Sequence, residues 1–274
     1  MQASKVSRRL KESTAPQVNE YIYRPRLEGF ASGFANLGNV NKAHILMLAE
    51  QGLIRGEHAS VLAKGVLDME QAGPEAVELD PSREDAYFNY EAHLIEHIGA
   101  DIGGRLHTGR SRNDILATLD RLRCRDLLMD LIDELATVRA TALCCAKRYA
   151  EVVMPGYTHL QPAQPITYGY YLSAVEQALE RDSKRLTQTL ESMNQCPLGA
   201  AAFAGTPFDI DRARTAELLG FDGYLDNALD AIGSRDFLLE SLSHLSNLAV
   251  FWSRVAQDYF VWSTHEFNLI DFPD

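Results

Sequence analysis

Basic residues are in short supply in this sequence of 274 residues. It has 26 lysines and arginines against 38 aspartates and glutamates, which leaves a formal net charge of −12. This acidic balance argues against a general nucleic-acid binder. The sequence also lacks a run of about 18 apolar residues, which a membrane-spanning helix needs, and no signal-peptide segment follows its charged first residues. We therefore expect neither nucleic acid nor a membrane among its partners.

Cysteine is also scarce, with only Cys124, Cys144, Cys145 and Cys196 and no zinc-binding spacing among them. We expect four buried thiols and a cytoplasmic protein. No phosphate-binding glycine loop is present. The segment His93–His97 fits a pattern of some zinc peptidases, but an amphipathic helix explains it equally well and no third acidic ligand stands out. We expect no metal and no organic cofactor.

Glycine and proline are absent from three long stretches, residues 112–154, 170–195 and 234–272. Apolar residues recur in the first and third at alternating steps of three and four, which predicts long amphipathic helices. The first would be roughly 60 Å long at 1.5 Å per residue. With no convincing strand alternation, the sequence predicts an all-α fold built on a bundle of long helices. Such helices cannot bury their apolar faces within one small subunit, so we expect a homo-oligomer.

The first hundred residues show shorter helical patterns around residues 42–51, 58–71 and 82–100, and Ser82 with Asp85 predicts the start of the last one. We therefore expect a smaller N-terminal helical domain at residues 1–110. The central long-helix bundle would occupy residues 111–274.

The segment HTGRSRND, residues 107–114, stands where the longest helix should begin. Ser111 is a good helix N-cap, and Asp114 three residues later completes a box-like pair with it. One interpretation is simply a well-capped helix. The segment also gathers hydrogen-bond donors at the positive end of a helix dipole, which suits an anion. These donors are Thr108, Arg110, Arg112 and Asn113.

The segment MPGYTHLQPAQP, residues 154–165, links the first two long stretches. It combines rigid prolines with Thr158, His159 and Gln161. A single histidine is often a structural hydrogen-bonding residue, and its polar neighbours are what favour a role in a site.

Four segments in the same order, HTGRSRND, MPGYTHLQPAQPITYG, PLGAAAFAGTPFDIDR and SRDFLLE, resemble argininosuccinate lyases, a family of the aspartase/fumarase superfamily. The resemblance implies a homotetramer whose long helices form a central bundle, with each active site shared between three chains. It implies a carbon–nitrogen lyase that eliminates an amine from an N-substituted aspartate and releases fumarate. No metal or organic cofactor is implied, and the substrate is a small dicarboxylate.

The resemblance also implies roles for particular residues. Proton removal next to a carboxylate leaves an aci-carboxylate, which needs several hydrogen-bond donors. His159 is implied as the general acid for the leaving nitrogen or as the residue that organises the base, and Thr158 acts beside it as a second catalytic residue. The implied substrate-binding residues are Thr108, Ser111, Arg112, Asn113 and Gln161.

The sequence departs from the family pattern in three places. Leu37 and Asn41 stand where the family has an aspartate and a serine, and Tyr170 stands in place of a histidine. Because the N-terminal segment helps to bind the leaving amine in the family, we expect an amine other than arginine. An aminopolycarboxylate lyase, resembling ethylenediamine-N,N'-disuccinate (EDDS) lyase, fits best. The alternatives are an argininosuccinate lyase, an adenylosuccinate lyase-like enzyme, and an inactive crystallin-like scaffold.

The family's catalytic serine lies on a mobile loop whose counterpart would follow Asp274. After that loop the family fold continues for well over a hundred residues. We therefore expect this chain to be a piece of a longer protein that lacks the C-terminal part of the family fold.

Overall fold

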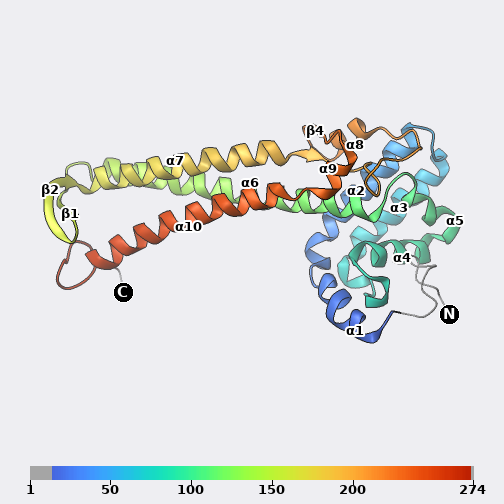
Figure 1. The fold of residues 1–274 in the computed structure, drawn as a ribbon, viewed down its shortest axis with the longest axis horizontal. Helices are drawn as coiled ribbons and strands as arrows, with labels where there is room; N and C mark the ends of the chain where they lie inside the picture. The colour runs from blue at the N-terminus through green and yellow to red at the C-terminus, as the bar shows by residue number, and fades with distance from the viewer. Residues whose placement is uncertain (1–13, 273–274) are drawn as a thin grey trace. The chain divides into compact units, whose positions relative to one another are not determined.

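The computed structural model describes residues 14–272, which divide into two compact units (Figure 1). The first unit comprises residues 14–123 and 194–234, and the second comprises residues 124–193 and 235–272. Helix α6 (Arg112–Arg148) begins in the first unit and ends in the second. This partition differs from a division at residue 110, because residues 194–234 pack with the N-terminal helices. The division into domains 1–110 and 111–274 stays a prediction.

The first unit is almost entirely helical. Its longer helices are α2 (Phe30–Glu50), α3 (Gly56–Ala72) and α4 (Ala86–Ile98). Its shorter helical segments are α1 (Pro16–Val18), η1 (Asn19–Tyr23), η2 (Arg24–Leu27), η3 (Pro74–Ala76), η4 (Pro81–Arg83), α5 (Ala100–Gly103), η5 (Gly104–His107), α8 (Arg212–Leu218) and α9 (Ala228–Gly233). Two short strands, β3 (Gln195–Cys196) and β4 (Gly223–Tyr224), pair in parallel.

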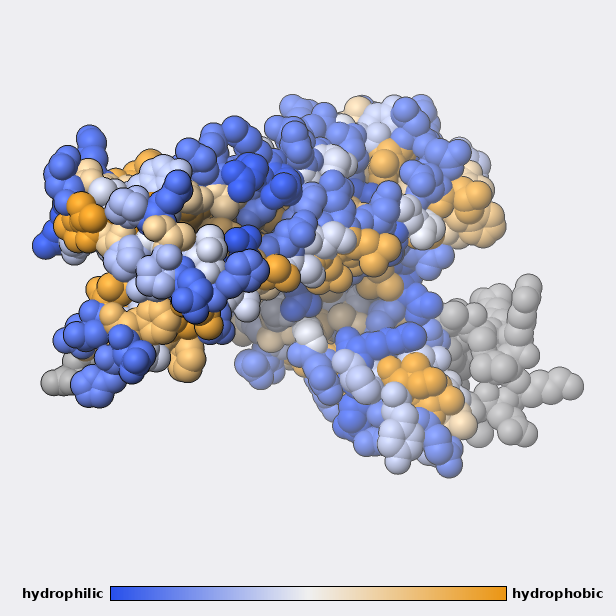
Figure 2. All heavy atoms as spheres, turned by 60° about the vertical axis from the view of Figure 1, so that its left-hand side comes forward, coloured by the Kyte–Doolittle hydropathy of each residue, from blue (hydrophilic) through white to orange (hydrophobic). Residues whose placement is uncertain are grey.

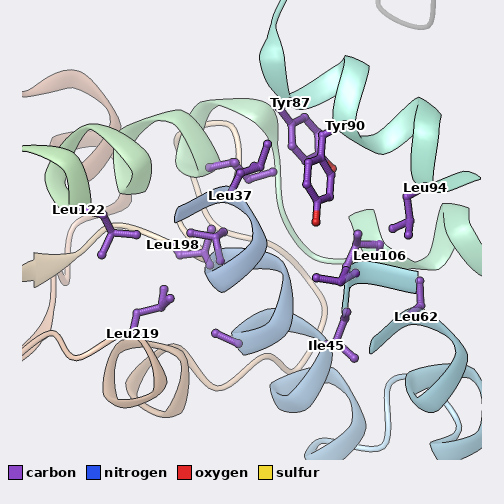
Figure 3. Close-up of a cluster of buried hydrophobic side chains, with 14 of the residues drawn as sticks. Leu37, Ile45, Leu62, Tyr87, Tyr90, Leu94, Leu106, Leu122, Leu198 and Leu219 are labelled. Carbon is purple, nitrogen blue, oxygen red and sulfur yellow. The ribbon is translucent and has the colours of Figure 1, made fainter. Parts of the chain in front are cut away.

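One apolar core holds the first unit together (Figure 3). It joins side chains from α2, α3 and α4 to the start of α6 and to the returning segment 194–234. Its labelled members in Figure 3 are Leu37, Ile45, Leu62, Tyr87, Tyr90, Leu94, Leu106, Leu122, Leu198 and Leu219. Burial of this apolar surface is the main force that fixes the loops described below.

Two N-terminal helix starts differ from the sequence-based prediction. Helix α2 begins at Phe30 rather than near residue 42. Gly33 and Gly38 weaken the helical signal there, but Phe34 and Leu37 bury their side chains in the core and outweigh that cost. The start predicted at Ser82 is also wrong. Asp85 caps α4 by accepting a hydrogen bond from the Phe88 N–H at 3.0 Å.

The second unit contains the rest of α6, a hairpin of β1 (Val153–Thr158) and β2 (Gln161–Thr167), and two more long helices, α7 (Tyr168–Met193) and α10 (Asp236–Trp262). Along α7, Val175, Leu179, Leu186 and Met193 recur at steps of four and seven and are all buried. The all-α prediction is confirmed, and the antiparallel hairpin is an addition that the proline-rich link did not reveal.

All three long helices end before the predicted residues, α7 by only two residues and the other two by more. Helix α6 stops at Arg148 because the chain turns into the hairpin, where the Tyr149 carbonyl accepts the Gly169 N–H at 3.0 Å. Helix α10 stops at Trp262 rather than 272. The Ser263 and Thr264 hydroxyls donate to carbonyls of the last turn, and this local bonding competes with helix continuation.

The long helices of the second unit keep large apolar side chains exposed. On α10 these are Leu239, Leu242, Val250 and Phe260. Figure 2 shows apolar groups of this kind between the polar side chains of the surface. Among the described residues, no helix is both long and apolar enough to cross a membrane. The prediction of four buried thiols is wrong for Cys144, which is exposed, and for Cys145, which is partly so.

Candidate active site

The segment 107–114 forms a turn that leads into α6. Gly109 has φ 75°, and a Cβ there would lie 3.0 Å from Ile210 Cγ2, so glycine is required. The predicted cap is present, although the Ser111 hydroxyl accepts from the N–H of Asn113 and not from that of Asp114, as a full capping box requires. The Ser111 Oγ lies 3.4 Å from the Asn113 N–H, and the Asp114 carboxylate accepts the Ser111 N–H at 2.9 Å.

Asp114 also makes contacts that the sequence motif did not predict. Its Oδ2 accepts the N–H groups of Gly199 and Ala201 at 3.0 and 2.9 Å, 85 and 87 residues away in the sequence. The side chain is fully buried, and burial raises its pKa to about 6, although the backbone hydrogen bonds act in the opposite direction. Asp114 thus joins the start of α6 to the segment 197–205.

Arg112 is engaged by two carboxylates of the protein. Its Nη1 lies 2.7 Å from Glu84 Oε2 and 3.2 Å from Asp85 Oδ2, and its guanidinium stacks 5.2 Å from the centre of the Phe88 ring. Burial raises the pKa of Asp85, and the neighbouring Arg112 acts against this rise. The charge of Arg112 is therefore largely balanced within the first unit.

Replacing Arg112 by methionine is expected to lower the free energy of unfolding by about 2–3 kcal/mol, because Glu84 and Asp85 would remain buried without their cation. Urea denaturation at neutral pH measures the loss. The same substitution at Arg105, whose ion pair with Asp101 is exposed, should cost under about 1 kcal/mol. Equal losses in the two variants would contradict this account.

Thr108 precedes Arg112 in the sequence, and Asn113 follows it. The Asn113 side chain is exposed, and its Nδ2 donates to the Ala202 carbonyl at 3.0 Å. The Thr108 carbonyl accepts a hydrogen bond from His44 Nε2 at 2.8 Å. Burial lowers the pKa of His44 well below its usual value, so this imidazole is neutral and donates through Nε2.

Arg110 is buried in the interior of the first unit. Its Nη2 donates to Asn41 Oδ1 at 2.7 Å, and its guanidinium lies 5.5 Å from the centre of the Tyr87 ring. Its Nε and Nη1 have no hydrogen-bond partner among the described residues. The positive charge of Arg110 acts on the buried carboxylate of Asp114, whose pKa it lowers.

Thr158, His159 and Gln161 come together at the end of the hairpin. His159 and Leu160 form its two-residue turn, with φ 51° and 58°, and Thr158 pairs with Gln161 across the strands. All four residues are exposed. The hairpin therefore presents the histidine and its polar neighbours to solvent at one tip.

The structure thus places the predicted site residues in two groups. Thr108, Ser111, Arg112 and Asn113 lie in the first unit, and Thr158, His159 and Gln161 lie in the second. Their roles in binding and catalysis stay predictions. Among residues 14–272, no group of three or more histidine, cysteine or acidic side chains is arranged to hold a metal ion.

The match to known proteins includes both segments of the candidate site. A family model described as "Lyase" matches residues 37–274. The argininosuccinate lyase of Methanosarcina mazei is 47% identical over 235 residues, which is 86% of this chain and 48% of that protein. The chain spans about half the length of the curated relatives it matches.

Solved structures of EDDS lyase share the fold. The complex with formate has a TM-score of 0.82 and 33% identity over 96% of this chain and 52% of that chain. A variant with bound fumarate has a TM-score of 0.80 and the same identity, over 94% of this chain and 51% of that chain. The family match, the relatives and these structures together place the chain in the aspartase/fumarase superfamily. This chain belongs to the lyase family and is an argininosuccinate lyase-like member of that superfamily.

Proposed function

We propose that the protein is a carbon–nitrogen lyase that eliminates an amine from an N-substituted aspartate and releases fumarate. One observation carries the proposal: HTGRSRND forms a capped helix start that exposes Asn113 at the N-terminus of α6 and holds it by a hydrogen bond to Ala202. Donors at the positive end of α6 suit a carboxylate. The match of the family model to residues 37–274 supports the same chemistry.

In this reaction a base removes a proton from the carbon next to one carboxylate, and the C–N bond on the neighbouring carbon breaks. The electrons of the C–H bond form the new double bond, and the amine leaves after nitrogen gains a proton. Negative charge accumulates on the carboxylate before the amine leaves, so donors placed there lower the barrier. Asn113, Ser111, Thr108 and Thr158 are proposed for this role. His159 is proposed to supply the nitrogen proton or to organise the base, with Gln161 beside it.

We propose an aminopolycarboxylate such as EDDS as the substrate. Leu37 is buried in the core and brings no charge to the N-terminal segment, whereas Asn41 contacts the Arg110 guanidinium directly. A guanidinium of the protein beside this segment favours an amine that carries carboxylates over one that carries a guanidinium of its own. The EDDS lyase structures support this choice. Argininosuccinate is the second candidate, because the 47% identical relative is an argininosuccinate lyase.

We further propose a homotetramer with shared active sites. Helix α6 is 37 residues long, and the two groups of predicted site residues belong to different compact units. The first residue of the helix belongs to one candidate segment, and its last residue precedes the hairpin by only a few residues. The exposed apolar side chains of α10 also support burial against other chains.

Fumarate release from EDDS and from argininosuccinate tests the proposal. We expect kcat/KM to be at least about tenfold higher for EDDS, because one mismatched charged group typically costs more than 1.4 kcal/mol. A reversed preference would make the protein an argininosuccinate lyase. Release of fumarate from neither compound would contradict the lyase proposal and favour a scaffold without activity.

A further inference from the structure

The segment 197–205 lies against the start of α6 although more than 80 residues separate the two in the sequence. Leu198 and Ala200 are fully buried, whereas residues 202–205 are exposed, with more than half of the Phe203 side chain accessible. We call residues 197–205 the crossing loop. Its exposed tip lies next to Asn113, which holds the Ala202 carbonyl at 3.0 Å.

The backbone of the crossing loop adopts a conformation that needs support. Gly199 has φ 87°, and a Cβ there would lie 2.8 Å from Arg212 Cγ, so the loop is tightly enclosed on that side. Ala201 has φ 55°, which is unfavourable for a residue with a side chain. The amides of both residues point to the same oxygen, Asp114 Oδ2.

We infer that Asp114 is a positioning residue that clamps the crossing loop onto α6 and thereby fixes Asn113 and the loop tip where the substrate carboxylate binds. This inference rests on the proposed function. One oxygen of the carboxylate accepts the Ser111 N–H and the other accepts two loop amides, so a single side chain sets the spacing of both segments. A neutral amide of the same shape has only one acceptor atom and cannot make both sets of bonds.

The charged groups around Asp114 are few. Arg110 lies near enough to lower its pKa, and Asp114 in turn raises the pKa of the buried Cys196 thiol, as a minor contribution beside burial. Neither side chain donates a hydrogen bond to Asp114 in the structure. The backbone amides are therefore the direct partners of this carboxylate, and they are what an Asp114 variant would release.

The test compares Asp114→Asn with Asp211→Asn. Asp211 is a matched control, because it caps α8 in the same unit by accepting the Arg214 N–H at 2.8 Å and makes no bond to the crossing loop. Two measurements are made on each variant: hydrogen exchange of the peptide covering residues 197–205, and the dissociation constant for succinate, an unreactive dicarboxylate.

We expect Asp114→Asn to speed exchange in the crossing loop at least tenfold and to weaken succinate binding at least tenfold, with exchange in α2 and α4 unchanged. Asp211→Asn should do neither. In assays of fumarate release, the KM of Asp114→Asn should rise by a larger factor than its kcat falls. A loss of stability alone would not produce this pattern.

If hydrogen exchange in the crossing loop of Asp114→Asn is as slow as in the wild-type protein, the inference is overturned. A loosened loop with unchanged succinate binding also overturns it, because Asp114 would then be only a structural cap. A wild-type protein that binds no succinate and releases no fumarate would overturn the proposed function and this inference with it. If the wild-type protein binds succinate and Asp114→Asn binds it equally well, only the inference is overturned and the proposed function stands.

Discussion

Replacing His159 by asparagine is expected to lower kcat for fumarate release by about 10²- to 10⁴-fold, the usual contribution of a general acid or base. The substitution removes the imidazole without disturbing the turn. His159 has φ 51°, and asparagine adopts positive φ more readily than histidine does. The hairpin should therefore keep its conformation, and the melting temperature should not fall.

The neighbouring turn residue provides the matched control. Leu160 is also exposed and has φ 58°, so Leu160→Asn makes the same change one position further along the turn. We expect its kcat to stay within about threefold of the wild-type value, because it leaves the proposed acid–base group intact. Steady-state assays of fumarate release compare the two variants. If His159→Asn is as active as Leu160→Asn, His159 has no part in proton transfer.

Replacing Asn113 by aspartate is expected to lower kcat/KM by about 10²- to 10³-fold, the effect of removing one donor to a developing negative charge. The variant loses the Nδ2 donor and places a negative charge where we propose that a carboxylate binds. It also loses the hydrogen bond to Ala202. The helix itself should tolerate the change, because an acidic residue in the first turn interacts favourably with the helix dipole.

Asn227 serves as the control for this substitution. It caps α9 in the same unit and accepts the N–H groups of Leu229 and Asp230 at 3.0 and 3.1 Å, which an aspartate can do equally well. Asn227→Asp should therefore keep kcat/KM close to the wild-type value. A loss below threefold in Asn113→Asp, measured under the same conditions, would exclude Asn113 from the carboxylate site.

How far the sequence predicts the structure depends on the range of the interactions. The cap at Ser111 and Asp114 was predictable, because its hydrogen bonds join residues two and three positions apart. The long helices were predictable because their apolar residues follow the helical period. Helix α2 shows the limit: its glycines weaken the local signal, and only burial of Phe34 and Leu37 in the core shows why it continues through them.

The candidate site shows the same limit more sharply. The sequence singles out Arg112 as a donor, yet the structure surrounds it with Glu84 and Asp85, whose distance from it in the sequence hides the ion pair. Asp114 looks like an ordinary capping residue until the crossing loop is seen against it. The segment PLGAAAFAG contributes to the family resemblance, but its backbone amides carry no sequence signal that they will bind Asp114.

By itself, the sequence determined the helical class, the start of α6, the polar link at residues 154–165 and the resemblance to a lyase family, because each is written in local spacing or in long motifs. Only the tertiary structure decided where α10 ends, that His159 occupies a hairpin turn with positive φ, and that Asp114 accepts hydrogen bonds from a distant loop. These features depend on backbone groups that meet through packing. Backbone groups are identical at nearly every position, so no pattern of side chains announces which of them will meet.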